Sequence, residues 1–130
     1  MSCPDCGGET LSFRVPDAHR ELLPGSDPGA SLCSRCLALR PASDPPADPP
    51  DLTPISDAFP SNPEAAVPLA LLVGLLDSLA RYRSEISTLL VAVERAGSDP
   101  LLAIDRLADD PDIDTDVDLR KRRHQLEQLL

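Results

Sequence analysis

Polar and apolar side chains alternate near the start of the chain, over residues 10–15 (TLSFRV). A period of two predicts a β-strand that leaves the first pair of cysteines. Leu32, Leu37 and Leu39 flank the second pair and predict another short hairpin. No other part of the chain is expected to form strands.

A short helical turn is predicted between these two segments. Asp17 is expected to cap it, and the turn should run from Ala18 to Leu23. Pro24-Gly25 would end it, because proline cannot continue a helix and glycine adopts the conformation that helix ends require.

Helical spacing of apolar residues begins after residue 63 and predicts four helices. The first, from about Pro63 to Ala80, is apolar around most of its circumference and should form the buried centre of a bundle. The second should run from about Arg83 to Ala96, with Gly97 as its C-cap.

The last two helices are predicted from their capping residues. The third should have Asp99 as N-cap and Pro100 at its first position, and should stop before Pro111. Thr115 and Asp118 have the spacing of a capping box for the fourth. Its apolar stripe consists of Leu119, Leu126, Leu129 and Leu130.

Residues 41–63 contain eight prolines and no basic residue, which predicts an extended linker. Leu52, Ile55 and Phe59 are apolar enough to dock this linker against the helices. The predicted organisation is a small β-hairpin zinc ribbon over residues 1–40, a Pro/Asp-rich linker over 41–63 and an all-α four-helix module over 64–130.

The charge balance of the 130-residue chain is strongly acidic, with a formal net charge of -10. Sixteen acids are Asp, and eleven of the twelve bases are Arg. This surface is typical of proteins from a high-salt cytoplasm, where carboxylates hold water and salt screens their repulsion. An acidic protein from a high-GC, low-salt organism remains the alternative.

The first residues, MSCPDCGGET, lack the basic and apolar regions of a signal peptide. The most apolar stretch, from Val67 to Ala80, is shorter than the roughly 20 residues that a membrane span needs. We therefore expect a soluble, cytoplasmic protein without a membrane partner. In a reducing compartment paired thiols are more often metal ligands than disulfides.

Four cysteines, in the pattern C-x2-C, 26 residues, C-x2-C, predict one structural zinc ion per chain. The ligands would be Cys3, Cys6, Cys33 and Cys36. Four thiolates close the coordination shell, so the site should be structural rather than catalytic. A segment of this size with one aromatic residue also needs the free energy that metal binding supplies.

Three other interpretations of the cysteines stay open. Iron in a rubredoxin-like site is one, although the aromatic residues that usually surround such iron are missing. A redox role for Cys-Pro-Asp-Cys is another, although that motif should follow a strand and open a helix. The third is a set of unliganded thiols.

The CPDCGG opening with a CSRC second pair resembles the small CPxCG-type zinc-finger proteins of haloarchaea. The SDAFPS, ALLVGLLDSLA, LAIDRLADDPD and HQLEQLL segments extend the resemblance to one haloarchaeal family of unknown function. The resemblance implies zinc at the four cysteines and implies no activity. The second pair lacks the proline and the trailing glycine of the first, so weaker amide donation to sulfur is expected there.

Other charged groups are interpreted as surface features. The basic run from Arg120 to His124 is expected to neutralise nearby Asp residues rather than to contact nucleic acid. The acids from Asp110 to Asp118 do not match a calcium loop, because Val117 and Arg123 would occupy the positions that need Gly and Glu. His19 is expected at the surface.

The sequence therefore predicts a non-catalytic zinc-binding protein that acts as a protein–protein interaction or regulatory adaptor, with no catalytic residues. A homodimer through the C-terminal leucine stripe could form, although packing of that stripe within one chain is favoured. The alternative function is a small nucleic-acid-associated zinc-ribbon regulator, an argument by fold analogy alone. Nucleic acid is not the favoured partner, because the chain is acidic.

Overall fold

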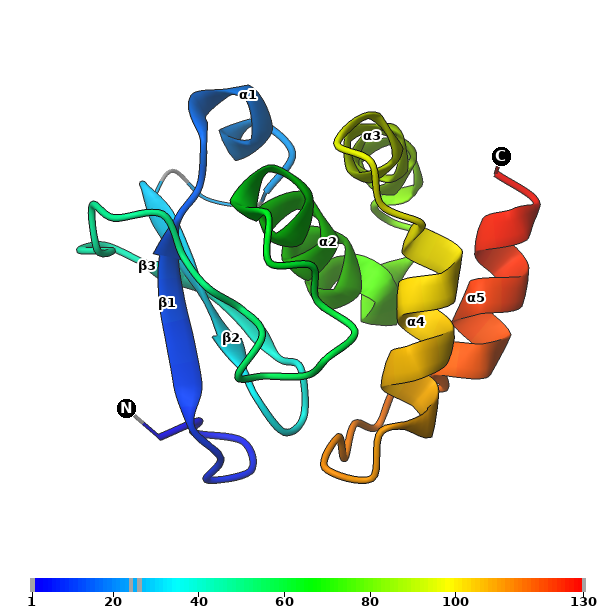
Figure 1. Cartoon of the computed structure of the whole chain (residues 1–130), viewed down its shortest axis with the longest axis horizontal. Coiled ribbons are helices and arrows are strands. Elements are labelled where there is room, and N and C mark those ends of the chain that lie inside the picture. Colours follow the sequence, from blue (N-terminus) through cyan, green and yellow to red (C-terminus); the bar gives the residue numbers. More distant parts are fainter. Residues whose placement is uncertain (1, 24, 26, 130) are drawn as a thin grey trace.

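A three-stranded antiparallel sheet forms the first part of the computed structural model, which describes residues 2–23, 25 and 27–129 (Figure 1). The strands are β1 (Thr10–Arg14), β2 (Gly29–Cys33) and β3 (Leu39–Ala42), in the spatial order β1-β2-β3. The predicted strand and the predicted second hairpin are both confirmed.

The register of the sheet places its large apolar residues in the core. Phe13 lies opposite Ala30, and Leu11 lies opposite Leu32. The side chains of Phe13 and Leu32 are fully buried. The period of two in the sequence thus corresponds to one buried face of the sheet.

Helix α1 (Asp17–Arg20) connects β1 to β2 and is shorter than predicted. Pro16, not Asp17, occupies the N-cap position, so the predicted cap is wrong. Asp17 instead forms a 3.0 Å ion pair with Arg20 within the helix. Pro24, the predicted terminator, lies outside the described residues, and Gly25 adopts a positive φ of 91°.

Helix α2 (Pro63–Leu75) lies between the sheet and the later helices (Figure 1). Asn62 caps it by accepting a hydrogen bond from the N–H of Glu64, and Pro63 occupies the first turn. Nearly all of its side chains are buried, as its apolar circumference predicts. A 3-10 turn, η1 (Leu76–Ser78), continues it toward the predicted end.

Helices α3 (Arg83–Arg95) and α4 (Pro100–Asp109) follow the predicted boundaries closely. Gly97 has a φ of 93° directly after the α3 C-cap, which is the conformation expected of a C-terminal glycine. Asp99 caps α4 by accepting hydrogen bonds from the N–H groups of Leu101 and Leu102.

Helix α5 (Leu119–Glu127) is capped by Asp118, which accepts from the N–H of Lys121. The predicted capping box is therefore wrong, because Thr115 lies outside the helix and accepts from the N–H of Val117. Leu119 and Leu126 are buried within the chain. Leu129 is half-buried, and Leu130 lies outside the described residues.

One hydrophobic core joins the three sequence segments. It includes Phe13 of the sheet, Leu52, Ile55 and Phe59 of the proline-rich segment, and apolar residues of α2 to α5. The predicted docking of the proline-rich segment is thus confirmed. Ser56 in that segment donates a 2.7 Å hydrogen bond to Asp110 at the end of α4.

The helices pack as two pairs rather than as four equivalent neighbours. Helix α2 packs on α3 and also contacts β3, while α4 packs on α5 (Figure 1). A separate four-helix module over residues 64–130 therefore stays a prediction. No helix in the described part of the chain is long and apolar enough to cross a membrane.

Candidate metal centre

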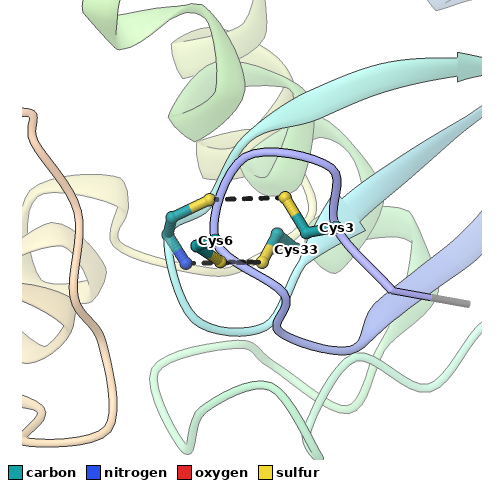
Figure 2. A group of neighbouring side chains, drawn as sticks. Cys3, Cys6 and Cys33 are labelled. Carbon is teal, nitrogen blue, oxygen red and sulfur yellow. Dashed lines mark hydrogen bonds between the residues drawn. The ribbon is translucent and has the colours of Figure 1, made fainter.

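The four cysteine sulfurs converge at the end of the sheet where both cysteine loops lie. All four Sγ atoms lie within 4.8 Å of one another. Figure 2 shows the sulfurs of Cys3, Cys6 and Cys33 turned toward a common point. Two contacts cross between the loops: Cys3 Sγ lies 3.8 Å from Cys36 Sγ, and Cys6 Sγ lies 3.5 Å from Cys33 Sγ.

These distances fit a tetrahedral metal ion. Metal–sulfur bonds of about 2.3 Å at tetrahedral angles place neighbouring sulfurs about 3.8 Å apart. A disulfide would need sulfurs about 2.05 Å apart, and all four thiols are free. The four cysteines predicted from the sequence are thus brought together in a geometry that could hold a metal ion.

The two cysteine loops share one backbone fold. In the first, the N–H of Gly7 donates to the carbonyl of Cys3 and the N–H of Cys3 donates to the carbonyl of Gly8. In the second, the N–H of Leu37 donates to the carbonyl of Cys33, whose own N–H donates to the carbonyl of Ala38. The matching bonds give the two loops the same backbone turn.

A leucine occupies a glycine-like conformation in the second loop. Gly7 has a φ of 77°, and Leu37 at the equivalent position has a φ of 64°. A non-glycine residue pays a cost of about 1–3 kcal/mol in this region. Leu37 is 5% exposed, so burial of its side chain in the core offsets part of that cost.

Backbone donation to sulfur is stronger at the second loop than expected. The N–H groups of Arg35 and Cys36 both lie 3.4 Å from Cys33 Sγ, and the N–H of Gly8 lies 3.4 Å from Cys6 Sγ. The expectation of weaker amide donation at CSRC is therefore wrong. The tight turn, rather than glycine itself, directs these N–H groups at the sulfur.

The pKa values of the two thiols in the second loop shift in opposite directions. Burial acts to raise the pKa of Cys33, but the N–H groups of Cys36 and Arg35 stabilise its thiolate and the pKa falls to about 7. Burial raises the pKa of Cys36 to about 12, and hydrogen bonds with the neighbouring thiols act in the same direction. Cys33 is therefore the more acidic of these two thiols.

Gly8 permits the first cysteine loop to approach Cys33 and Arg35 of the second loop closely. A Cβ at Gly8 would lie 2.9 Å from the Cβ of Arg35 and 3.2 Å from Cys33 Sγ. Both distances are shorter than ordinary van der Waals contacts. The GG that follows Cys6 thus serves two purposes, since Gly7 supplies a positive φ and Gly8 supplies space.

The model of a family of unknown function, DUF6276, matches residues 2–130 of the chain. The chain belongs to the DUF6276 family. The match covers the cysteine loops, the sheet and all the later helices, so the family extends well beyond the four cysteines. Searches of curated proteins and of solved structures found no match.

The four-cysteine group of this DUF6276 chain is tied to a distant acidic segment. The N–H of Asp114 donates a 2.7 Å hydrogen bond to the carbonyl oxygen of Arg35, which lies between the third and fourth cysteines. Sequence reasoning missed this contact, because 79 positions separate the two residues and neither type marks such a bond.

Two arginines of the basic run on α5 form ion pairs with acids. Arg120 forms an ion pair with Asp109, and Arg123 pairs with Asp105 at 2.9 Å and with Glu127. These contacts accord with the predicted charge neutralisation. Lys121 and Arg122 instead line a hollow that also borders Cys6 and Cys36.

The acids of residues 110–118 do not gather into a second metal site. Among the described residues the four cysteines form the one group of three or more convergent metal-ligating side chains. Asp110 accepts from Ser56, and Asp118 caps α5. His19 lies in α1, outside the cysteine group, and is half-buried, which lowers its pKa.

Proposed function

We propose that the four cysteines bind one structural zinc ion and that the protein is a non-catalytic interaction adaptor. The observation that carries the proposal is the closed set of four thiols with tetrahedral spacing. Zinc suits this donor set, because it accepts tetrahedral thiolate coordination without a redox change. Four protein ligands leave no open position at which a substrate could reach the ion.

The location of the centre supports a structural role. The cysteine loops lie at one end of β2, and the N–H of Asp114 ties the second loop to the chain that precedes α5. A bound ion would hold together the two cysteine loops, and through Arg35 it would also position the acidic segment. Zinc would thereby stabilise a surface rather than a reaction.

The surface charge supports a protein partner over a nucleic acid. The net charge of -10 repels phosphate, and Arg120 and Arg123 on α5 are already paired with acids. A four-thiolate zinc site adds a formal charge of about -2, since four thiolates outweigh one divalent ion. A halophilic, cytoplasmic setting belongs to the same proposal and rests on the Asp-rich composition and the CPxCG resemblance.

Affinity capture tests the adaptor role. The tagged full chain, loaded with zinc, is incubated with lysate of its source cells, and untagged full chain is added as competitor in a parallel sample. We expect a small set of proteins to be retained and then displaced by the competitor. Retention of nothing that the competitor displaces would contradict the adaptor function.

A further inference from the structure

Two hollows form a groove beside strand β3. A hollow of about 960 Å³ lies between β3, the end of α2 and residues 114–119, and it borders Cys6 and Cys36. A second hollow of about 220 Å³ shares with it Leu39, Arg40, Gly74 and Asp77. The two hollows therefore adjoin and follow the strand from the metal centre toward Gly25.

The outer edge of β3 carries unpaired backbone groups. In antiparallel ladders, residues alternate between hydrogen-bonded and non-hydrogen-bonded pairs. The N–H of Cys33 donates to the carbonyl of Ala38, which makes these two residues a hydrogen-bonded pair. The register then directs the backbone groups of Arg40 toward Ser31, and those of Leu39 away from the sheet.

The other edge of β2 supports the same alternation. The N–H of Ser34 donates to the carbonyl of Glu9, and the N–H of Val15 donates to the carbonyl of Pro28. The backbone N–H and C=O groups of even-numbered residues of β2 thus point toward β1. Those of odd-numbered residues point toward β3. On β3, the backbone groups of Leu39 and Pro41 consequently point away from β2.

Pro41 fits this arrangement, because its missing N–H would face outward and no ladder bond is lost. The open edge therefore offers the N–H and the carbonyl of Leu39 and the carbonyl of Pro41. In the described part of the chain no further strand pairs with this edge. An extended segment could pair with it as a fourth strand.

Charge identifies the kind of segment that fits. The larger hollow is lined by five acids, Asp5, Asp77, Asp114, Asp116 and Asp118, and by three bases, Arg40, Lys121 and Arg122. Arg40 is already paired with Asp5 at 2.6 Å. The excess of acids beside the thiol centre favours a cationic ligand and disfavours phosphates or a second copy of this acidic chain.

We propose that this groove binds an extended segment of a partner protein that carries Lys or Arg side chains and pairs with the backbone of Leu39. The segment adds a strand to β3, and its basic side chains meet the acids on the groove wall. This inference rests on the proposed adaptor function and names the surface that performs it. The metal centre shapes one end of the groove through Cys6 and Cys36.

The test uses the zinc-loaded full chain and three acetylated eight-residue peptides. One alternates valine and arginine, one alternates valine and glutamate, and one keeps the arginines but replaces two valines with proline. Binding is measured by calorimetry at low and at moderate salt. We expect the first peptide to bind, the second not to bind, and the third to bind about tenfold more weakly because it cannot pair as a strand.

Two double variants locate the binding site. Asp77→Asn with Asp116→Asn removes charge from the groove and should weaken the arginine peptide about threefold to tenfold. Asp48→Asn with Asp57→Asn removes the same charge from exposed positions outside both hollows and should change binding by less than about twofold. Amide exchange followed by NMR should show slower exchange of the Leu39 N–H when the arginine peptide is bound.

Several outcomes would overturn the groove. The first is that the glutamate peptide binds as tightly as the arginine peptide. The second is that both double variants weaken binding of the arginine peptide equally. The third is that the arginine peptide does not slow amide exchange of the Leu39 N–H. Protection of Leu39 without peptide, in a dimer, would assign the edge to a second copy instead. If affinity capture retains a partner equally well with the Asp77→Asn, Asp116→Asn chain, the groove fails while the adaptor function stands.

Discussion

The N–H of Asp114 donates a 2.7 Å hydrogen bond to the carbonyl oxygen of Arg35. This bond joins the segment between α4 and α5 to the loop that carries Cys33 and Cys36. The N–H groups of Arg35 and Cys36 point at Cys33 Sγ, so a metal ion bound to that sulfur would restrain the same loop. The order of the acidic segment should therefore depend on the metal.

Removal of the metal should accelerate hydrogen exchange at Asp114. A chelator is added to the full chain, and amide exchange is compared before and after. The N–H of Leu101, which Asp99 holds at the start of α4, serves as the internal control and should change much less. Equal protection of Asp114 in both states would show that the segment is ordered independently of the metal centre.

Gly74 and Leu39 define how closely α2 approaches the sheet. A Cβ at Gly74 would lie 2.4 Å from the Cβ of Leu39. The Leu39 Cβ is bonded to the backbone, so a change of side-chain rotamer cannot move it away. Gly74→Ala should lower the free energy of unfolding by about 1–2 kcal/mol, because overpacking outweighs the helix propensity gained by replacing glycine. Urea denaturation measures the change.

A helical position without such a contact supplies the control for Gly74. Thr88 is exposed on α3, and Thr88→Ala should change the free energy of unfolding by no more than about 0.5 kcal/mol. If Gly74→Ala stabilised the protein as a simple gain in helix propensity would, the close packing of α2 on β3 would be refuted.

The two glycines after Cys6 should respond differently to alanine. Gly8→Ala places a Cβ 3.2 Å from Cys33 Sγ and 3.3 Å from Cys6 Sγ, so it should weaken metal binding about tenfold. Gly7→Ala meets no atom within 4 Å but strains a φ of 77°, so it should lower stability by about 1 kcal/mol with a smaller effect on metal affinity. Competition with a chromophoric chelator measures the metal affinity of both variants, and equal affinities would contradict the geometry.

Metal affinity should fall as the pH falls. The pKa of Cys36 is raised to about 12, so metal binding displaces its proton across the whole neutral range. The pKa of Cys33 is about 7, so below that pH a second proton must be displaced. These two thiols alone predict a slope of about tenfold per pH unit at pH 8 that steepens toward pH 6.

Proton release on metal addition checks this pH dependence directly. The chain is titrated with zinc in weakly buffered solution at pH 8 and at pH 6, and more protons should be released at the lower pH. An affinity that stays constant between pH 6 and pH 8 would mean that the thiols are not the ligands.

Local signals made much of this fold predictable. The paired cysteines, the alternation around Phe13 and the Asp99-Pro100 helix start each act through neighbours in the sequence. Asp17 and Thr115 misled because several residues near a helix start can act as caps, and the chain path decides which one does. The core positions of Leu52, Ile55 and Phe59 followed from their apolar character.

Long-range contacts lay beyond the sequence. Nothing at Gly74 indicates that its missing side chain makes room for Leu39, and nothing at Asp114 indicates Arg35 as its partner. The backbone donors at Cys33 were also missed, because the glycine of the first loop suggested that glycine was needed for donation. The four candidate ligands could be named from spacing, but the groove beside them required the whole fold.

The zinc content of the purified full chain tests the central claim most directly. Native mass spectrometry and elemental analysis of chain expressed in a medium that contains both zinc and iron should give one zinc per chain. Cys33→Ser should lose the ion, and Ser34→Ala in the same loop should retain it. A folded chain without metal, or Cys33→Ser that keeps a full zinc complement, would contradict the account.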